Sequence, residues 1–371
     1  ARIDFVQRVP IPPPTELVVT NLNDSGPGSL REALALIAED GRDAFYEGSI
    51  AKAIDAYMKE IGAYLSYEDL ANHRGSWIEP VCANYRGWDV WELPPNGQGI
   101  AALEMLNILE AYDLSSMGYL DPEYLHLLIE AKKLAFADRA KYYADPAFGD
   151  LPVDALISKA YADSQRQRIN RDRAATDVPA GDPKLIHGDT IYLSVVDKDR
   201  NCCSFIQSNY YGFGSKVTPG DLGFVLQNRG ALFALDDTHL NRLEPHKRPF
   251  HTIIPAMVTN QGRPWLCFGV MGGDMQPQGH VQVLINMIDF GLNVQAAGDA
   301  PRVRHIGSAQ PTGKEADGAG TLNVEAGIPE AAIRGLIKKG HKIGRASSGF
   351  GGYQGIQIDW DRGTLHGATE S

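Results

Sequence analysis

The chain has 371 residues, with 35 lysines and arginines against 46 aspartates and glutamates, which gives a formal net charge of −11 at pH 7. This acidic balance argues against nucleic acid as the main partner, because binding phosphates needs a basic surface. No apolar run reaches the roughly 20 residues of a membrane-spanning helix. We therefore predict a water-soluble globular protein that binds neither nucleic acid nor membrane, in a compartment that the composition leaves open.

Cysteine and histidine spacing predicts neither a disulfide scaffold nor a metal site. The four cysteines are scattered, and Cys202 and Cys203 are adjacent in a strand-like run, where we expect buried free thiols. The ten histidines form no HxxxH pair, and no CxxC occurs. We therefore expect no structural zinc, no catalytic metal and no cofactor.

The first half of the chain predicts mainly helices. Ser49 fits the cap of one helix, residues 66–69 fit a capping box, and Asp121 followed by a proline fits a cap and first helical position. Apolar residues change to a period of two in the short stretches that predict strands. In chain order we predict helices at 29–41, 49–61 and from 66, strands at 78–81 and 88–93, and helices at 99–111 and 121–143.

The second half of the chain has a different pattern, with a polar segment followed by strand-like apolar runs. A polar segment at 171–188, rich in Asp, Pro and Gly, reads as a linker and leads directly into an apolar run. After it we predict strands at 190–196, 202–210, 223–227, 253–258 and 265–270, then a helix at about 276–290. Strands followed by helices indicate a layered α/β sandwich without internal repeats.

Several common catalytic motifs are absent. The chain has no GxSxG nucleophile elbow and no GxxxxGK[ST] phosphate loop, and the stretch 349–354 lacks the last glycine of GxGxxG. The acidic pairs Asp236–Asp237 and Asp197/Asp199 lie in turn-like stretches, where solvated carboxylates are the simpler interpretation.

Thr190 stands where the linker meets the buried strand. Its simplest interpretation is a strand residue. If the chain is cut between Asp189 and Thr190, however, one residue carries both a hydroxyl and a new α-amino group. That amine has an ordinary pKa of about 8 and accepts the hydroxyl proton near neutral pH, so no histidine is needed. Gly272 and Gly273, at the start of a helix, supply backbone N–H groups suited to an oxyanion hole, although on their own they fit a plain turn.

Short motifs then carry a resemblance to the γ-glutamyltranspeptidase family of N-terminal-nucleophile hydrolases. It runs from about residue 40 to the C-terminus and rests on ordered blocks at 45–49, 83–87, 93–95, 137–139, 189–190, 194–197, 247–249, 272–273 and 301–302. Within the family, the stretches 213–215, 227–230 and 272–278 resemble a divergent bacterial subgroup with transpeptidase-like, acylase-like and oxamate amidohydrolase members.

The resemblance implies a four-layer αββα sandwich (α/β, α+β) and a precursor that cleaves itself into two chains. Residues 1–189 would form the large-subunit portion, incomplete before residue 40, and 190–371 the small subunit. These chains would stay together as a heterodimer, with a higher homo-oligomer left open. Thr190 matches the family's catalytic threonine, Ser208 a residue that supports it, and Gly272 and Gly273 the oxyanion hole.

The substrate pocket departs from the family pattern. Where γ-glutamyl enzymes hold the substrate's α-amine with acidic and amide groups, this chain has Arg229 and Leu232. His251 and Thr252 replace the usual serine pair, and we include Tyr210 among the substrate-binding residues. An arginine repels an ammonium group and attracts a carboxylate. Arg229 would instead be structural if it pairs with Asp221 or Asp274.

The sequence thus predicts a self-processing threonine amidohydrolase that acts on a small carboxylate-bearing amide. Glutathione hydrolysis or γ-glutamyl transfer is what the family resemblance implies by default. The pocket residues favour a glutaryl (cephalosporin) acylase or an oxamate-type amidase. An inactive binding scaffold is the alternative of another class, and the intact Thr190 and Gly272–Gly273 count against it.

Overall fold

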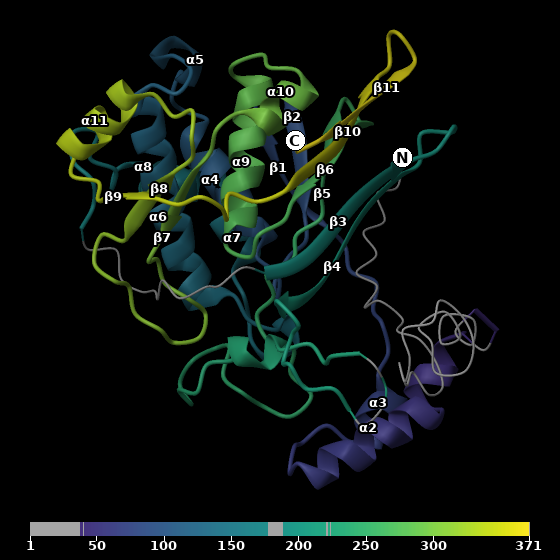
Figure 1. Cartoon of the computed structure of the whole chain (residues 1–371). Coiled ribbons are helices and arrows are strands. Elements are labelled where there is room, and N and C mark those ends of the chain that lie inside the picture. Colours follow the sequence, from purple (N-terminus) through teal and green to yellow (C-terminus); the bar gives the residue numbers. More distant parts are fainter. Residues whose placement is uncertain (1–37, 40, 177–187, 220–221, 223, 371) are drawn as a thin grey trace. The chain divides into compact units, whose positions relative to one another are not determined.

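The computed structural model describes residues 38–39, 41–176, 188–219, 222 and 224–370. They divide into two compact units (Figure 1). The described part of the larger unit covers 79–176, 188–208 and 229–370, and that of the smaller unit covers 38–78 and 209–228 with the gaps just given. Each unit draws on both sides of the predicted cleavage point, and the division into chains 1–189 and 190–371 stays a prediction.

The smaller unit contains α2 (Ser49–Glu60) and α3 (Tyr67–Asn72). One face of α2 is buried with Phe45 and Leu222 in a hydrophobic cluster, as its helical period predicts. The capping box of α3 is confirmed, since Ser66 and Asp69 exchange hydrogen bonds between side chain and backbone.

Two predicted helix ends in this unit are wrong, and so is one strand. Ser49 is the first residue of α2 and Gly48 is its N-cap, without a side-chain hydrogen bond. Residues 41–46 are helical beyond the stop predicted at Gly41. The described residues 224–227 form no strand, because Leu226 hydrogen-bonds locally with the backbone of Ser215 and Val217 in a loop.

The larger unit is built on a six-stranded sheet in the order β1-β2-β5-β6-β10-β11, with every neighbouring pair antiparallel. A second sheet pairs β3 with β4, whose residues 209–211 already belong to the smaller unit, and a third sheet has the order β7-β8-β9. The strands are β1 (Val81–Tyr85), β2 (Trp88–Glu92), β3 (Gly188–Val196), β4 (Cys202–Tyr211), β5 (Ala256–Asn260), β6 (Arg263–Val270), β7 (Val303–Ile306), β8 (Thr321–Val324), β9 (Ile343–Arg345), β10 (Tyr353–Asp359) and β11 (Thr364–Thr369).

Strand β6 shows what covers the two faces of the large sheet. Gly269 lies against the ring of Tyr192 in β3. The neighbouring Phe268 and Val270 contact α9 (Met275–Ile288), through His280 and Gly279. Successive strand residues point to opposite faces, so β3 packs on one face and α9 on the other. Helix α9, the six-stranded sheet and the β3–β4 sheet are therefore three successive layers. The fourth layer of the predicted αββα sandwich stays a prediction.

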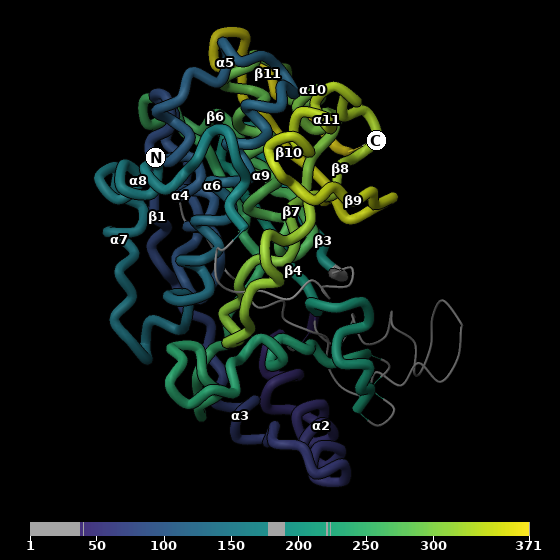
Figure 2. The backbone as a smooth tube through the Cα atoms, turned by 90° about the vertical axis from the view of Figure 1, so that its left-hand side faces the viewer, coloured from purple at the N-terminus to yellow at the C-terminus, as the bar shows by residue number. Residues whose placement is uncertain are grey.

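Helices cover the α9 side of the sheet. Helix α4 lies beside both α6 and α9 (Figures 1 and 2). No helix in the described part of the chain is long and apolar enough to cross a membrane. The remaining helices are α4 (Gly99–Leu109), α5 (Leu114–Met117), α6 (Pro122–Tyr142), α7 (Val153–Leu156), α8 (Lys159–Arg166), α10 (Val294–Asp299) and α11 (Glu330–Lys338), with 3-10 turns η1 (Pro146–Phe148) and η2 (Arg229–Leu232).

Most element predictions in this unit hold, with three corrections. The strand predicted at 78–81 shares only its last residue with β1, which runs from Val81 to Tyr85, because Pro80 has no N–H for a strand ladder. Strand β5 begins at Ala256 rather than 253, since the N–H of Ile254 is bound by the side chain of Gln276. Cys203 is exposed and Cys202 is half-buried, whereas both were expected to be buried.

Candidate active site

Thr190 is the third residue of β3 and is half-buried. Its Oγ1 donates a hydrogen bond to the Oγ of Ser208, at 3.0 Å, in the paired strand β4. Residues 189 and 190 belong to the same strand. The structure thus brings together the threonine and the serine that we predicted as nucleophile and supporting residue, joined by a hydrogen bond between their hydroxyls.

Gly272 and Gly273 form the turn between β6 and α9. Their φ angles of 122° and 58° lie in the region that favours glycine. The carbonyl of Gly272 accepts from the N–H of Met275, at 3.0 Å. Because a trans peptide holds its N–H opposite its C=O, the N–H of Gly273 points away from the helix. A Cβ at Gly273 would meet no atom within 4 Å, so the space beside its Cα is open.

A small hydrophobic cluster draws the predicted site segments together. It consists of Tyr192, Ile206 and Ile253, with Met271 packed against it. These residues lie within two positions of Thr190, Ser208, Thr252 and Gly272, respectively. The strand that carries Thr190 and the glycine turn thus share the same apolar contacts.

Arg229, in η2, is 2% exposed, and its Nη1 donates to the Oγ1 of Thr252 at 2.6 Å. His251 precedes that threonine, and its Nδ1 accepts from the N–H of Ile253 at 3.2 Å. Burial, together with the charge of Arg229, holds the pKa of His251 well below its usual range. His251 is therefore neutral, with its proton on Nε2. Three of the four predicted substrate-binding residues come together here, beside Leu232, which is also buried.

Asp274 and Asp221 were the carboxylates that we considered as internal partners of Arg229. Asp274 forms its ion pair with Arg139, at 2.8 Å between Oδ1 and Nη1. Asp221 lies outside the described residues. Tyr210, the fourth predicted substrate-binding residue, belongs to the smaller unit, where its ring stacks on that of Tyr211. Its part in the site stays a prediction.

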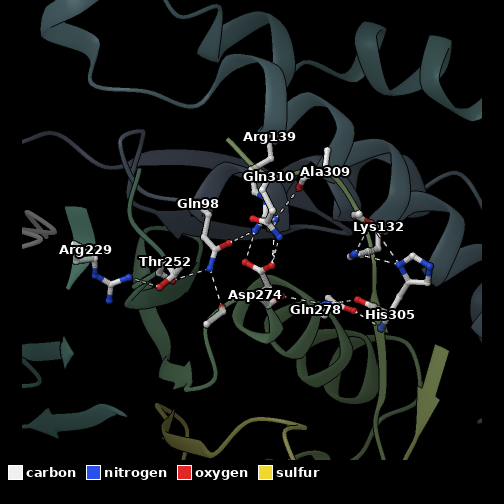
Figure 3. A network of polar contacts seen from close by, with 12 residues as sticks. Gln98, Lys132, Arg139, Arg229, Thr252, Asp274, Gln278, His305, Ala309 and Gln310 are labelled. Carbon is white, nitrogen blue, oxygen red and sulfur yellow. Dashed lines mark hydrogen bonds and ion pairs between the residues drawn. The ribbon is translucent and has the colours of Figure 1, made fainter. Parts of the chain in front are cut away.

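Behind the glycine turn lies a network of buried polar groups that the sequence did not reveal (Figure 3). Gln98 bridges the carbonyls of Thr252 and Gly273 with its amide nitrogen, at 2.7 and 2.9 Å. Its Oε1 accepts from Arg139, which also contacts Asp274. The only sequence hint was that residues 137–139 and 272–278 belong to the blocks that carry the resemblance.

Asp274 is the anion of this network. Burial alone would raise the pKa of its carboxyl, but the Arg139 guanidinium and the hydrogen bonds from Arg139 and Gln310 hold that pKa below its usual range. Through Gln278 the network continues to His305, whose Nδ1 contacts the buried Nζ of Lys132 (Figure 3). Asp274 therefore stays ionised, directly after Gly273.

The acidic pairs that we set aside behave as predicted. Asp197 accepts from the backbone of Asp199 and Asn201, and Asp236 accepts from Thr238 in its own turn.

One cluster among the described residues has metal-ligating side chains, namely His126, Glu130 and His341, with donor atoms within 4.8 Å of one another. Sequence spacing missed it because His341 is far along the chain. His126 hydrogen-bonds His341 at 2.8 Å, and Glu130 is paired with the ammonium of Lys133 at 2.8 Å. A cation already neutralises the carboxylate, so we interpret the cluster as a buried polar network.

Comparison with known proteins shows the family of the chain. The family model described as gamma-glutamyltranspeptidase matches residues 28–371. The chain belongs to the γ-glutamyltranspeptidase family, whose members are enzymes.

Individual relatives of the chain carry the names of two kinds of enzyme. The chain is 39% identical to the glutathione hydrolase-like YwrD proenzyme of Bacillus subtilis, over 99% of this chain and 67% of that protein. It is 37% identical to the acylase ACY 1 proenzyme of Pseudomonas sp. strain SE83, over 91% of this chain and 58% of that protein. The crystal structure of a cephalosporin acylase from Bacillus halodurans matches with a TM-score of 0.81 and 43% identity, covering 91% of this chain and 60% of that one. The chain thus spans between 58% and 67% of these relatives' lengths.

Proposed function

We propose that this protein is a self-processing amidohydrolase that uses Thr190 as its nucleophile. Cleavage between Asp189 and Thr190 would begin with attack of the Thr190 hydroxyl on the carbonyl carbon of Asp189. The resulting ester is hydrolysed by water, which leaves a carboxylate on residue 189 and a free α-amine on residue 190. We further propose that the two chains remain associated within the four-layer αββα sandwich.

In the cleaved enzyme, Thr190 would attack the substrate amide. Its hydroxyl proton passes to its own α-amine, whose ordinary pKa of about 8 suits a base near neutral pH. The N–H groups of Gly272 and Gly273 hold the negative charge of the tetrahedral intermediate, and the leaving amine takes the proton. Water then releases the acyl group from Thr190. Ser208, at 3.0 Å from the nucleophile, orients the hydroxyl during both steps.

The acyl group of the substrate would carry a carboxylate. The observation that supports this is the buried Arg229, held by Thr252 beside the neutral His251. A guanidinium is a good donor to a carboxylate and repels an ammonium group. A glutaryl or oxamyl group fits this site better than γ-glutamyl, whose α-amine would face Arg229. The acylases among the relatives fit the same proposal.

γ-Glutamyl transfer or glutathione hydrolysis is the second candidate, and the glutathione hydrolase-like relative favours it. The two are separated by kcat/KM for glutaryl-p-nitroanilide and γ-glutamyl-p-nitroanilide. We expect the wild type to prefer glutaryl and Arg229→Gln to lose about 30-fold or more on glutaryl, the cost of removing one partner of a buried charge pair. The loss on γ-glutamyl should be much smaller.

Arg242→Gln is the matched control, since Arg242 lies in the same stretch and pairs with Glu244 at the surface. It should keep the wild-type preference. A clear preference of the wild type for γ-glutamyl would contradict the role of Arg229.

A further inference from the structure

The hydrogen-bond partners of Gln98 fix the orientation of its side-chain amide. It is fully buried and immediately precedes α4. Its Oε1 accepts from Arg139 at 2.7 Å, and its Nε2 donates to the carbonyls of Thr252 and Gly273 at 2.7 and 2.9 Å. A guanidinium only donates and a carbonyl only accepts, so the amide has one possible orientation. Both amide hydrogens are then used.

The two carbonyls belong to the two halves of the site (Figure 3). Thr252 holds Arg229 through its side chain, on the side proposed to bind the acyl carboxylate. Gly273 belongs to the turn proposed as the oxyanion hole. One nitrogen within hydrogen-bond distance of both oxygens fixes their separation.

Gln98 is itself anchored to the glycine turn by a second route. The Nη1 of Arg139 contacts both Gln98 and Asp274, at 2.7 and 2.8 Å, and Asp274 directly follows Gly273. The contacts therefore close a ring from Gly273 through Gln98, Arg139 and Asp274 back to Gly273. A closed ring of buried, partly charge-assisted hydrogen bonds resists rotation of the peptide groups that it holds.

We propose that Gln98 is a positioning residue that sets the Gly272–Gly273 turn at a fixed distance from the Arg229–Thr252 pair. In this way the carbonyl under attack and the acyl carboxylate are held together in one geometry. The inference rests on the proposed function of the site. It adds a residue that touches neither the nucleophile nor the substrate.

The test uses Gln98→Met, which keeps the length of the side chain and removes all three hydrogen bonds, and Gln98→Glu, which keeps an acceptor for Arg139 but cannot donate to the carbonyls. We expect both variants to lower kcat per cleaved chain by about 10- to 100-fold, the cost typical of a small misplacement of reacting groups. Inhibition by free glutarate, which needs Arg229 and no oxyanion hole, should stay within about threefold of wild type.

Gln282→Met is the matched control. Gln282 is also a buried glutamine that bridges two carbonyls, those of Gln278 and Val303, at 2.9 and 3.0 Å, but it does not contact the turn. It should lose stability as Gln98→Met does and keep the wild-type kcat. A merely structural role for Gln98 would give the two Met variants the same kcat.

The inference is overturned if cleaved Gln98→Met and Gln98→Glu keep kcat within about threefold of wild type. It is also overturned if glutarate binding falls in parallel with kcat. Should the wild type prefer γ-glutamyl, the proposed substrate is wrong, and the kcat comparison on γ-glutamyl-p-nitroanilide still decides the role of Gln98.

Discussion

At the scale of residues, His126 and His341 form a buried pair, and the titration of His341 makes the stability of this protein depend on pH. The Nε2 of His126 contacts the carbonyl of Asn170 at 2.8 Å and so carries a proton. In the neutral pair, the Nδ1 of His126 then accepts from the Nε2 of His341. Burial, with the charge of Lys133 as the next cause, lowers the pKa of His341 to about 3. The fold thus requires His341 to be neutral.

We predict that acid destabilises the protein through this pair. The unfolded chain binds a proton at His341 below a pH of about 6.5, and the folded chain does so only near pH 3. The stability that the neutral His341 contributes is therefore fully present above pH 6.5 and is lost as the pH falls toward 3. Between pH 7 and pH 5 it amounts to about 2 kcal/mol. Urea unfolding at several pH values should show a shallower pH dependence in His341→Gln.

His366→Gln is the control, because His366 is exposed on β11. It should leave the pH dependence of unfolding as in the wild type. If His341→Gln instead showed the full wild-type pH dependence, the histidine pair would not be the cause.

At the scale of residues, the linker-to-strand junction pointed to Thr190, and the family resemblance added Ser208 and the two glycines, whose catalytic roles stay predictions. Arg229 stood out because its charge is wrong for an ammonium ligand. Gln98, Arg139 and Asp274 were not recognised, because their contacts join positions 41 and 135 residues apart. Only the packing of α6 against the turn before α9 brings them together.

At the scale of elements, the contact of β3 with β6 holds the strand that carries Thr190. The ring of Tyr192 lies over Gly269, and a Cβ at that glycine would come within 2.6 Å of ring atoms. The Tyr192 hydroxyl hydrogen-bonds Ser194 and Ser204. The absence of a side chain at residue 269 therefore allows the two strands to approach.

Gly269→Ala should displace β3. We expect a loss of stability of about 1–3 kcal/mol, the usual cost of overpacking, and slower self-cleavage, since Thr190 moves with its strand. Gly367→Ala, in β11, is the matched control, because a Cβ there meets no atom within 4 Å. Thermal unfolding and the rate of chain cleavage measure the two effects. Equal behaviour of the two variants would show that β3 is not held by this contact.

Elements were predictable where local signals agree with packing. Asp121 caps α6 through the N–H of Glu123, as its sequence indicates, and α6 ends within one residue of the prediction. The apolar stretch at 224–227 fails because its backbone groups pair within a loop, and residues 253–255 fail because a side chain of α9 binds their backbone. Hydrophobic pattern alone does not tell a strand from an ordered loop that packs on a core.

At the scale of the whole molecule, the proposed self-cleavage would make one chain into two. The match to the γ-glutamyltranspeptidase family runs across the predicted cut, and both sides of it contribute to the larger unit. The proposed site needs residues from both sides of the cut. Gln98 and Arg139 precede the cut, whereas Arg229 and the glycine turn follow it.

The intact mass of the purified protein tests this central claim most directly. Cleavage that Thr190 itself performs should yield two fragments, the later one beginning at Thr190 with a free α-amine. Thr190→Ala should remain a single chain, since no hydroxyl can attack the carbonyl of Asp189. Efficient cutting of Thr190→Ala at the same bond, in the absence of proteases, or a wild type that is fully active as a single chain, would contradict the account.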